Sequence, residues 1–346
     1  MDLKPTFVFR PQPALETLVH QPFPNLPDPL GPLSLLPGKW TGTGFNMIWR
    51  PLFGTPGQDH FLELNLISET LEFAPIPGPI PNRGLLQPDI NMFGVHYLQQ
   101  ISDSNTGAGL HMEPGIWATV PQTTNPDEPP TVVRMGTIPH GTSILIQGTA
   151  IPSAGGPTPF PPISTIPFDI GDRNSPRPMP EAQLSVPSPF RSPPAQMAGI
   201  TQAMLDDPNT VLEAAAAGQT ILATTTMLVF SEDDAQSQGG IDVGGGTANT
   251  AFLVGSAGGP NAVAAEASAA FWIEQVAGEN GEPDFLQLQY SQQVLLNFNG
   301  LSWPHITVAT LRKQVPVQVP PQYVDPDIPA EDLQRIATAR AESGNL

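Results

Sequence analysis

The chain has 346 residues, with 13 basic against 32 acidic side chains, and its formal net charge of −19 lacks the basic footprint that nucleic acid or an anionic membrane surface attracts. It contains no cysteine, which excludes disulfides, thiolate metal sites, cysteine nucleophiles and iron–sulfur clusters. Its start, MDLKPTFVFRPQP, has no signal-peptide core, and no apolar run approaches the roughly 18 residues of a transmembrane helix, so we expect a soluble, cytoplasmic protein.

The two ends of the chain differ from the region between them. Residues 1–30 are rich in proline and predict an extended arm. Residues 316–346 predict a linker followed by a helix, IPAEDLQRIATARAE, with Pro329 near its start. Residues 31–315 are therefore expected to form the folded domain.

Short strands are predicted through most of this domain. FLELNLISETLEF (61–73) alternates apolar and polar residues over its first half, and that period of two is typical of β structure. Turn-forming clusters such as SDSNTGAG and TTNPDEPP separate the segments. Strands are predicted from residue 38 onward and at 61–73, 95–102, 115–121, 131–138, 142–150, 219–231, 251–256, 269–276, 285–298 and 305–313.

An insertion over residues 151–218 interrupts the strands. Residues 151–198 contain 13 prolines, a density that a central strand does not tolerate because proline donates no ladder hydrogen bond. Residues 200–218 predict one or two short helical pieces, with a break at Asp207-Pro208-Asn209 and a stop at Gly218.

The pattern predicts an all-β fold, an antiparallel up-and-down barrel of about ten strands with few helices. Closing a sheet removes its edges and leaves an interior for a small ligand. A β-sandwich is the competing architecture, and composition does not separate the two.

Six stretches carry recognisable motifs in a fixed order, over 31–150 and 219–313. They resemble those of the nitrobindin family, calycin-like ten-stranded barrels that bind haem. The stretches are LSLLPGKWTGTG with Gly38, Trp40, Gly42 and Gly44; ETLEF; GVHYLQQIS with Tyr97 and Gln99; LHMEPGIW with His111, Glu113, Gly115 and Trp117; IPHGTSILIQGT; and FLQLQYSQQVLL followed by PHITVATLRK with His305.

The resemblance implies a ferric haem b whose iron is ligated by His305 and which reacts with nitrogen oxides or peroxide, as in peroxynitrite isomerisation. If His305 faces inward, alternation also places Thr307, Ala309 and Leu311 inside, where small residues leave room for a flat macrocycle. The remaining cofactor-contacting residues predicted with them are Trp40, Tyr97 and Trp117. Trp40 is also expected to plug one end of the barrel, with its indole N–H on a backbone partner.

The other histidines are assigned different places. His111 and His140 are predicted to lie on the opposite face of the haem as catalytic residues. The competing interpretation makes His140 a turn residue and His111 a strand-start side chain paired with Glu113. His96 is expected at the surface or just behind the residues that line the site. His60, in a loop, and His20, in the N-terminal arm, are expected to be exposed to solvent.

Two further functions remain open. A lipocalin-like carrier of an apolar small molecule would share the barrel and Trp40 but give His305 no special task. A barrel recruited to metabolite chemistry would use the insertion 151–218 as a lid. The GxSxG, P-loop and HExxH motifs are absent from the sequence. The sequence leaves the oligomeric state open, a homodimer included.

Overall fold

The computed structural model describes residues 28–155, 158–231, 245–256 and 259–314. Most of the predicted N-terminal arm, including His20, and the whole of the predicted C-terminal helix lie outside these residues. Among the residues that are described, no helix has the length and apolar character needed to cross a bilayer.

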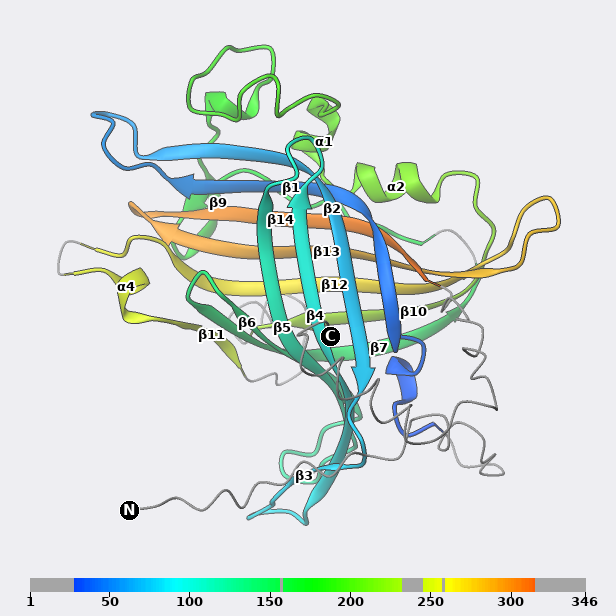
Figure 1. Cartoon of the computed structure of the whole chain (residues 1–346). Coiled ribbons are helices and arrows are strands. Elements are labelled where there is room, and N and C mark those ends of the chain that lie inside the picture. Colours follow the sequence, from blue (N-terminus) through cyan, green and yellow to red (C-terminus); the bar gives the residue numbers. More distant parts are fainter. Residues whose placement is uncertain (1–27, 156–157, 232–244, 257–258, 315–346) are drawn as a thin grey trace, which may run out of the picture. The chain divides into compact units, whose positions relative to one another are not determined.

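Ten antiparallel strands form a closed barrel (Figure 1), as the sequence predicts. Each strand pairs with the next in the order β1-β2-β4-β5-β6-β7-β10-β12-β13-β14, and β1 then pairs with β14, from Trp40 opposite Lys313 to Ile48 opposite His305. Their bounds are β1 Gly38–Pro51, β2 His60–Pro75, β4 Ile90–Asp103, β5 Gly109–Val120, β6 Thr131–Ile138, β7 Thr142–Ala154, β10 Ile221–Phe230, β12 Val263–Val276, β13 Phe285–Phe298 and β14 Leu301–Lys313.

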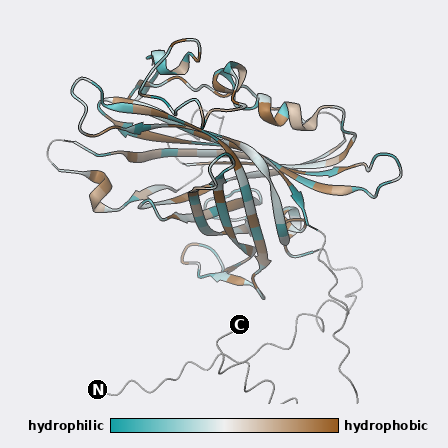
Figure 2. Ribbon diagram, turned by 45° about the horizontal axis from the view of Figure 1, so that its top comes forward, coloured by the Kyte–Doolittle hydropathy of each residue, from teal (hydrophilic) through white to brown (hydrophobic). Residues whose placement is uncertain are grey.

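Alternation along these strands creates two hydrophobic faces, and bands of opposite hydropathy follow the strands in Figure 2. On β14, Ala309 and Leu311 belong to the cluster inside the barrel, whereas Ile306 and Val308 belong to a second cluster on the outside. A barrel strand with one solvated face needs only the inner cluster. The outer cluster therefore indicates that something covers this part of the wall.

One end of the interior is packed solid around Trp40. Its ring is fully buried, and its indole Nε1 donates to the carbonyl of Leu36 over 2.8 Å. Leu36 follows the short 3₁₀ helix η2 (Gly31–Leu33), and Leu33 and Leu36 join the same inner cluster. The predicted plug with a backbone partner is confirmed.

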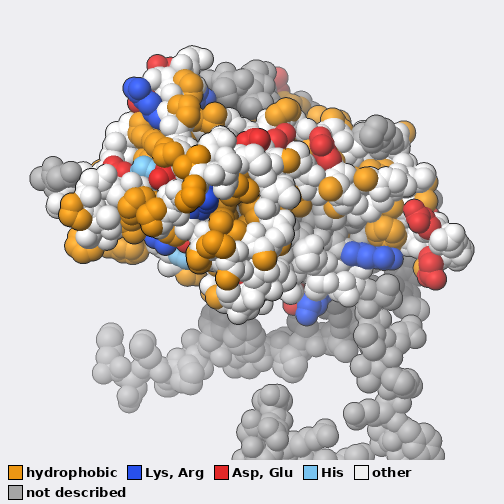
Figure 3. All heavy atoms as spheres, turned by 90° about the horizontal axis from the view of Figure 1, so that it is seen from above, with side chains coloured by type: hydrophobic (Ala, Val, Ile, Leu, Met, Phe, Trp, Pro, Cys, Tyr) orange, Lys and Arg blue, Asp and Glu red, His pale blue; other side chains and the backbone are white. Residues whose placement is uncertain are grey.

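The insertion covers part of the outer face of the barrel (Figure 1). The view of the molecule from above in Figure 3 shows many hydrophobic side chains at the surface on that side. The insertion begins later than predicted, because β7 continues to Ala154 in register with β10. It contains β8 (Phe168–Asp169), β9 (Asp172–Pro176), the 3₁₀ helix η3 (Pro180–Ala182), α1 (Gln202–Asp206) and α2 (Thr210–Ala216). The two helical pieces and the break between them agree with the prediction.

Backbone pairing fixes the insertion to the edge of β2. That strand pairs with β4 only from Ile67 onward, which leaves an open edge at its start. The amide of Leu62 donates to the carbonyl of Phe190, and the amide of Ser192 donates to the carbonyl of Leu62. Covering an unpaired edge in this way satisfies its hydrogen-bonding groups.

The predicted strand at 251–256 is wrong. β11 (Gly246–Asn249) pairs with β7 where β10 has already ended, and Ala251–Val254 then forms the short helix α4. A four-residue apolar run fits helix and strand equally well by periodicity. A second short strand outside the barrel, β3 (Ile80–Asn82), pairs with the start of β4.

Candidate functional site

The end of the barrel remote from Trp40 is hollow. The cavity there measures about 330 Å³, within the range of small-molecule sites. Polar groups alternate with apolar walls around it. The lining residues are Asn46, Ile48, Arg50, Glu63, Gln99, Ile101, Leu110, His111, Ile138, His140, Thr142, Leu253, Ala262, Ala264, Tyr290, Gln292, Val294, Leu296, His305 and Thr307.

His305 lies on the cavity wall, near the start of the last strand. Its Nε2 is 3.0 Å from the side-chain amide nitrogen of Asn46, on the neighbouring strand β1. Burial, with smaller contributions from the nearby imidazoles of His111 and His140, lowers the pKa of His305 to about 3. The ring is therefore neutral near pH 7, and the Asn46 amide donates to Nε2.

Thr307 and Asn46 extend this polar strip into the barrel. The amide nitrogen of Asn46 also reaches the hydroxyl of Thr307 at 2.9 Å and the carbonyl of Ile306 at 3.3 Å. His305 and Thr307 line the cavity, and Ala309 and Leu311 continue into the packed interior. The inward alternation predicted for this strand is confirmed.

His111 and His140 line the same cavity from the far side. In the closed strand order, β5 with His111 lies four places from β14, and His140, exposed in the turn between β6 and β7, follows the strand five places away, so both histidines lie opposite His305. Their rings stack with centroids 6.0 Å apart, and Nε2 of His111 is 3.4 Å from a carboxylate oxygen of Glu113. A bulge in β5 brings one more residue to the cavity. Ile101 and Ser102 on β4 are in register with His111 and Gly109 on β5, so Leu110 between them is an extra residue, and it lines the cavity.

A buried ion pair lies beneath these histidines. Arg134 donates to the Glu113 carboxylate over 2.8 Å and to the Tyr97 hydroxyl over 3.1 Å, and Tyr97 donates to Glu113. Burial is the largest single influence and raises the pKa of Glu113, but the Arg134 guanidinium and the hydrogen bonds from His111 and Tyr97 together outweigh it, and the pKa falls to about 2. Burial raises the pKa of Tyr97 well above its usual range. The group is thus one fixed charge pair with a neutral phenol.

Two opposed glycines make room for this group. Gly115 and Gly136 are register partners on β5 and β6. A Cβ at Gly115 would lie 2.5 Å from the Tyr97 ring, and one at Gly136 would lie 2.2 Å from the Glu113 carboxylate. Only glycine fits at these positions, which explains the small residues beside a buried aromatic and a buried acid.

A second buried carboxyl group lies near the cavity floor. Glu69 accepts from the Tyr290 hydroxyl over 2.6 Å and from the Gln99 amide over 2.8 Å. Burial raises the pKa of Glu69 to about 7, against the lowering effect of those hydrogen bonds. Tyr290, Gln99 and Gln292 line the cavity, and Gln292 accepts from Arg134 over 2.5 Å. The floor is thus polar and connected to both buried acids.

The remaining predicted residues lie away from the cavity lining. Trp40 is in the packed end, and Trp117 packs edge-on against Phe271 in the interior. Tyr97 is one layer below the cavity in the Arg134 group. Trp49 and Trp272 belong to the outer cluster under the insertion.

Of the other histidines, His96 is exposed, as predicted. The prediction of an exposed loop is wrong for His60, whose side chain is only 12% exposed at the start of β2. Its ring packs 4.8 Å from that of Trp303 and 5.7 Å from that of Trp49, beneath the insertion. The insertion supplies the cover that the sequence does not reveal.

Sequence reasoning overlooked Asn46, Glu69, Arg134, Tyr290 and Gln292. A signal existed for Arg134, a lone charge at an inward position of an alternating apolar strand. Its partner was not deducible, because the register between strands is set only in the folded sheet.

The described residues include no group of three His, Cys, Asp or Glu side chains placed to hold a metal ion. They define a closed ten-stranded β-barrel with a ligand-sized, partly polar cavity at one end. No family model matches the chain, and no curated protein matches it.

Among solved structures, the chain is similar to the crystal structure of Rv2717c from M. tuberculosis. The identity is 15% and the TM-score 0.38, over 84% of this chain and 100% of that one. A likeness at this level carries no argument about function.

Proposed function

We propose that the barrel binds haem b in this cavity, with His305 as the axial ligand of the iron. The observation that supports the proposal most is a neutral imidazole on the wall of a hollow. A haem iron takes a neutral imidazole nitrogen, and burial keeps His305 in that form at any pH above about 3.

The residues around His305 fit a flat, apolar macrocycle. Ile101, Leu110, Ile138, Val294 and Leu296 supply apolar walls. A macrocycle is larger than a 330 Å³ hollow, so one edge would project through the mouth, past the partly exposed pair of Arg50 and Glu63. Asn46 would give up its bond to Nε2 on ligation and keep its contacts with Thr307 and Ile306.

His111 and His140 face the other side of such a ligand. Bound haem would supply a ferric iron able to react with a nitrogen oxide or a peroxide, the chemistry that the nitrobindin resemblance implies. The two imidazoles would donate hydrogen bonds to a reactant there, with His111 oriented by Glu113. Peroxynitrite isomerisation is the reaction we propose to assay first.

The experiment is a titration of purified protein with haemin, followed by its absorption spectrum. We expect a Soret band for the wild type and its loss in His305→Ala. His96→Ala is the matched control, because His96 is exposed on the barrel's outside, and it should bind as the wild type does. A Soret band retained in His305→Ala would overturn the assignment of the ligand, and none in the wild type would overturn haem binding altogether.

The bond between Asn46 and Nε2 and the small volume favour a second candidate, a carrier of a smaller apolar molecule without iron. In that role, His305 and Asn46 act as a hydrogen-bonding pair. If the purified protein does not bind haemin but binds a fatty acid or a small aromatic molecule, the result would support this carrier function.

A further inference from the structure

Two glutamine side chains reach the floor of the barrel cavity from different parts of its wall, Gln99 from β4 and Gln292 from β13. Both adjoin the same buried ion pair. Gln292 accepts a hydrogen bond from Arg134, and Gln99 is the register partner of Glu113 on the neighbouring strand. The two amides therefore share one part of the floor, next to the pair of Arg134 and Glu113.

Arg134 sets the orientation of the Gln292 amide. A guanidinium can only donate hydrogen bonds, so the atom that it contacts is the oxygen Oε1, and the nitrogen Nε2 is turned away from it. Gln292 is partly exposed, and its Nε2 has no hydrogen-bond partner among the described residues and is not one of their enclosed polar atoms. Gln292 thus presents a free N–H donor to the cavity.

Glu69 sets the Gln99 amide in the opposite sense. The carboxylate accepts from Nε2 of Gln99 over 2.8 Å, and the Tyr290 hydroxyl, which itself donates to Glu69, accepts from the same nitrogen over 3.2 Å. The oxygen Oε1 is therefore turned away from both groups. Gln99 is 5% exposed, and this oxygen is neither bonded to a described residue nor enclosed by them. Gln99 thus presents a free acceptor to the cavity.

The charged groups beneath the floor are occupied. Arg134 pairs with Glu113 over 2.8 Å, so it is not available to an anionic ligand. Glu69 is only 3% exposed, so it is not available to a cationic one. Above the two amides, Ile101 and Val294 supply apolar walls. The cavity therefore suits an uncharged ligand with one polar edge.

We propose that the cavity floor selects an uncharged, mainly apolar molecule with a carbonyl group and an N–H group on one edge, as in a lactam. The Gln292 amide donates to the carbonyl oxygen, and Oε1 of Gln99 accepts from the N–H group. A polar group buried without a partner is costly, so a molecule that lacks either contact binds more weakly. The proposal rests on the second candidate function, the carrier of a small apolar molecule, and names its ligand class.

The test compares two isomers, 4-methyl-2-quinolone and 1-methyl-2-quinolone, by calorimetry. They share the ring and the carbonyl group, but the second carries its methyl group on nitrogen and has no N–H. The measurement is made at pH 8, above the pKa of about 7 to which burial raises Glu69, so that the ionised carboxylate holds Gln99 in one orientation. We expect saturable, one-to-one binding of 4-methyl-2-quinolone and roughly tenfold weaker binding of its isomer.

Two variants assign the contacts. Gln99→Met removes the acceptor, so the two isomers should then bind equally. Gln292→Glu keeps an oxygen on Arg134 and replaces the donor by a carboxylate oxygen, so it should weaken both isomers roughly tenfold. Gln292→Leu replaces it if it fails to fold. Gln100→Met and Gln100→Glu are the matched controls, because Gln100 is exposed on the outer face of β4, and they should bind as the wild type does.

The outcomes separate the ligand class from the carrier function. Equal binding of the isomers by the wild type, or a preference that survives in Gln99→Met, would overturn the ligand class and leave the carrier function intact. No saturable binding of either isomer would also overturn the ligand class. The titrations with haemin and with a fatty acid then show separately whether haem binding or the carrier function stands.

Discussion

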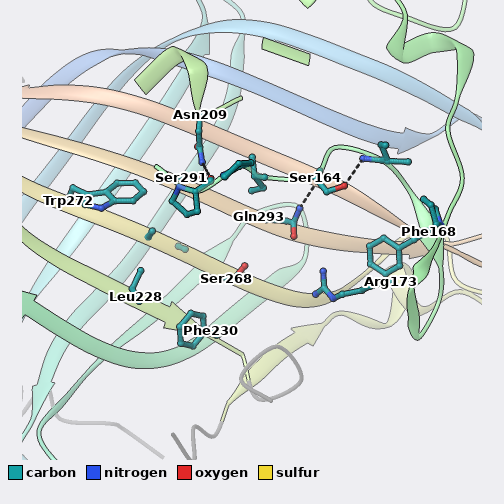
Figure 4. Close-up of a pocket in the computed structure, with 17 residues that line it drawn as sticks. Ser164, Phe168, Arg173, Asn209, Leu228, Phe230, Ser268, Trp272, Ser291 and Gln293 are labelled. Carbon is teal, nitrogen blue, oxygen red and sulfur yellow. Dashed lines mark hydrogen bonds between the residues drawn. The ribbon is translucent and has the colours of Figure 1, made fainter. Parts of the chain in front are cut away.

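The barrel cavity and a second hollow of about 510 Å³, which lies outside the barrel between its wall and the insertion (Figure 4) and is called the outer hollow, use opposite faces of β12 and β13. The two differ in the side chains that border them. Below the cavity and at its floor, polar side chains are tied into buried networks: Arg134 with Glu113 and Tyr97, and Glu69 with Tyr290. The outer hollow instead depends on small side chains beneath a proline-rich roof. The two faces of one strand can thus border empty space in different ways, with paired polar groups on one face and small side chains on the other.

The difference lies in the cost of disturbing each side. A buried charge cannot lose its partner without a large penalty, whereas a small side chain in a hollow has little packing to lose. Substitutions on the two faces should therefore differ several-fold in their effect on the free energy of unfolding.

Arg134→Met should have the largest effect. It leaves the Glu113 carboxylate buried without its counter-charge, and we expect a loss of about 3–5 kcal/mol in the free energy of unfolding, measured with urea. Arg50→Met is the matched control, since Arg50 pairs with Glu63 at a side-chain exposure of 40%, and it should cost about 0–1 kcal/mol. Equal losses in the two variants would contradict the view that Arg134 carries the inner network.

His305 should make stability depend on pH. Its pKa rises from about 3 in the folded protein to its ordinary 6.5 on unfolding, so the unfolded state binds an extra proton between these values. The contribution of neutral His305 to the free energy of unfolding is complete above pH 6.5 and is lost as the pH falls toward 3.

The measurement compares wild type with His305→Gln at pH 7.5 and pH 5. We expect the wild type to lose more stability than the variant on acidification, by about 1–2 kcal/mol over this interval. The raised pKa of Glu69 acts in the opposite direction, but it is common to both proteins and cancels in the difference. If wild type and His305→Gln lose the same stability between pH 7.5 and pH 5, His305 protonates as readily in the folded state as in the unfolded state.

Ser291→Ala, on the floor of the outer hollow, should have the smallest effect. The substitution removes one hydroxyl from a space that is not packed, and we expect a change within about 0.5 kcal/mol. A loss as large as that of Arg134→Met would mean that the outer hollow, too, is held open by polar contacts.

Much of the fold was predictable because strand periodicity is local. Alternation in 61–73 and the turn clusters identified nearly every barrel strand, and β6 and β13 have the bounds predicted for them. The strand at 251–256 was mispredicted because four apolar residues carry no period. His60 was mispredicted because its cover comes from residues more than a hundred positions away.

For the candidate site, alternation from His305 correctly predicted which residues of β14 face inward. It did not predict that Trp117 would fill the packed part of the interior rather than line the cavity. Whether the barrel interior is filled at a given height along its axis depends on the side chains that all ten strands contribute at that height. The sequence of a single strand does not specify this.

The sequence by itself determined nearly every barrel strand, the inward residues of the last one and the absence of cysteine chemistry, because these follow from composition and from a period of two. Tertiary structure alone decided that Asn46 meets His305, that Arg134 meets Glu113 and Tyr97, and that a proline-rich insertion covers the outer wall. Those contacts join residues as far as 259 positions apart, and the register and closure of the sheet, which depend on the whole barrel, bring them together.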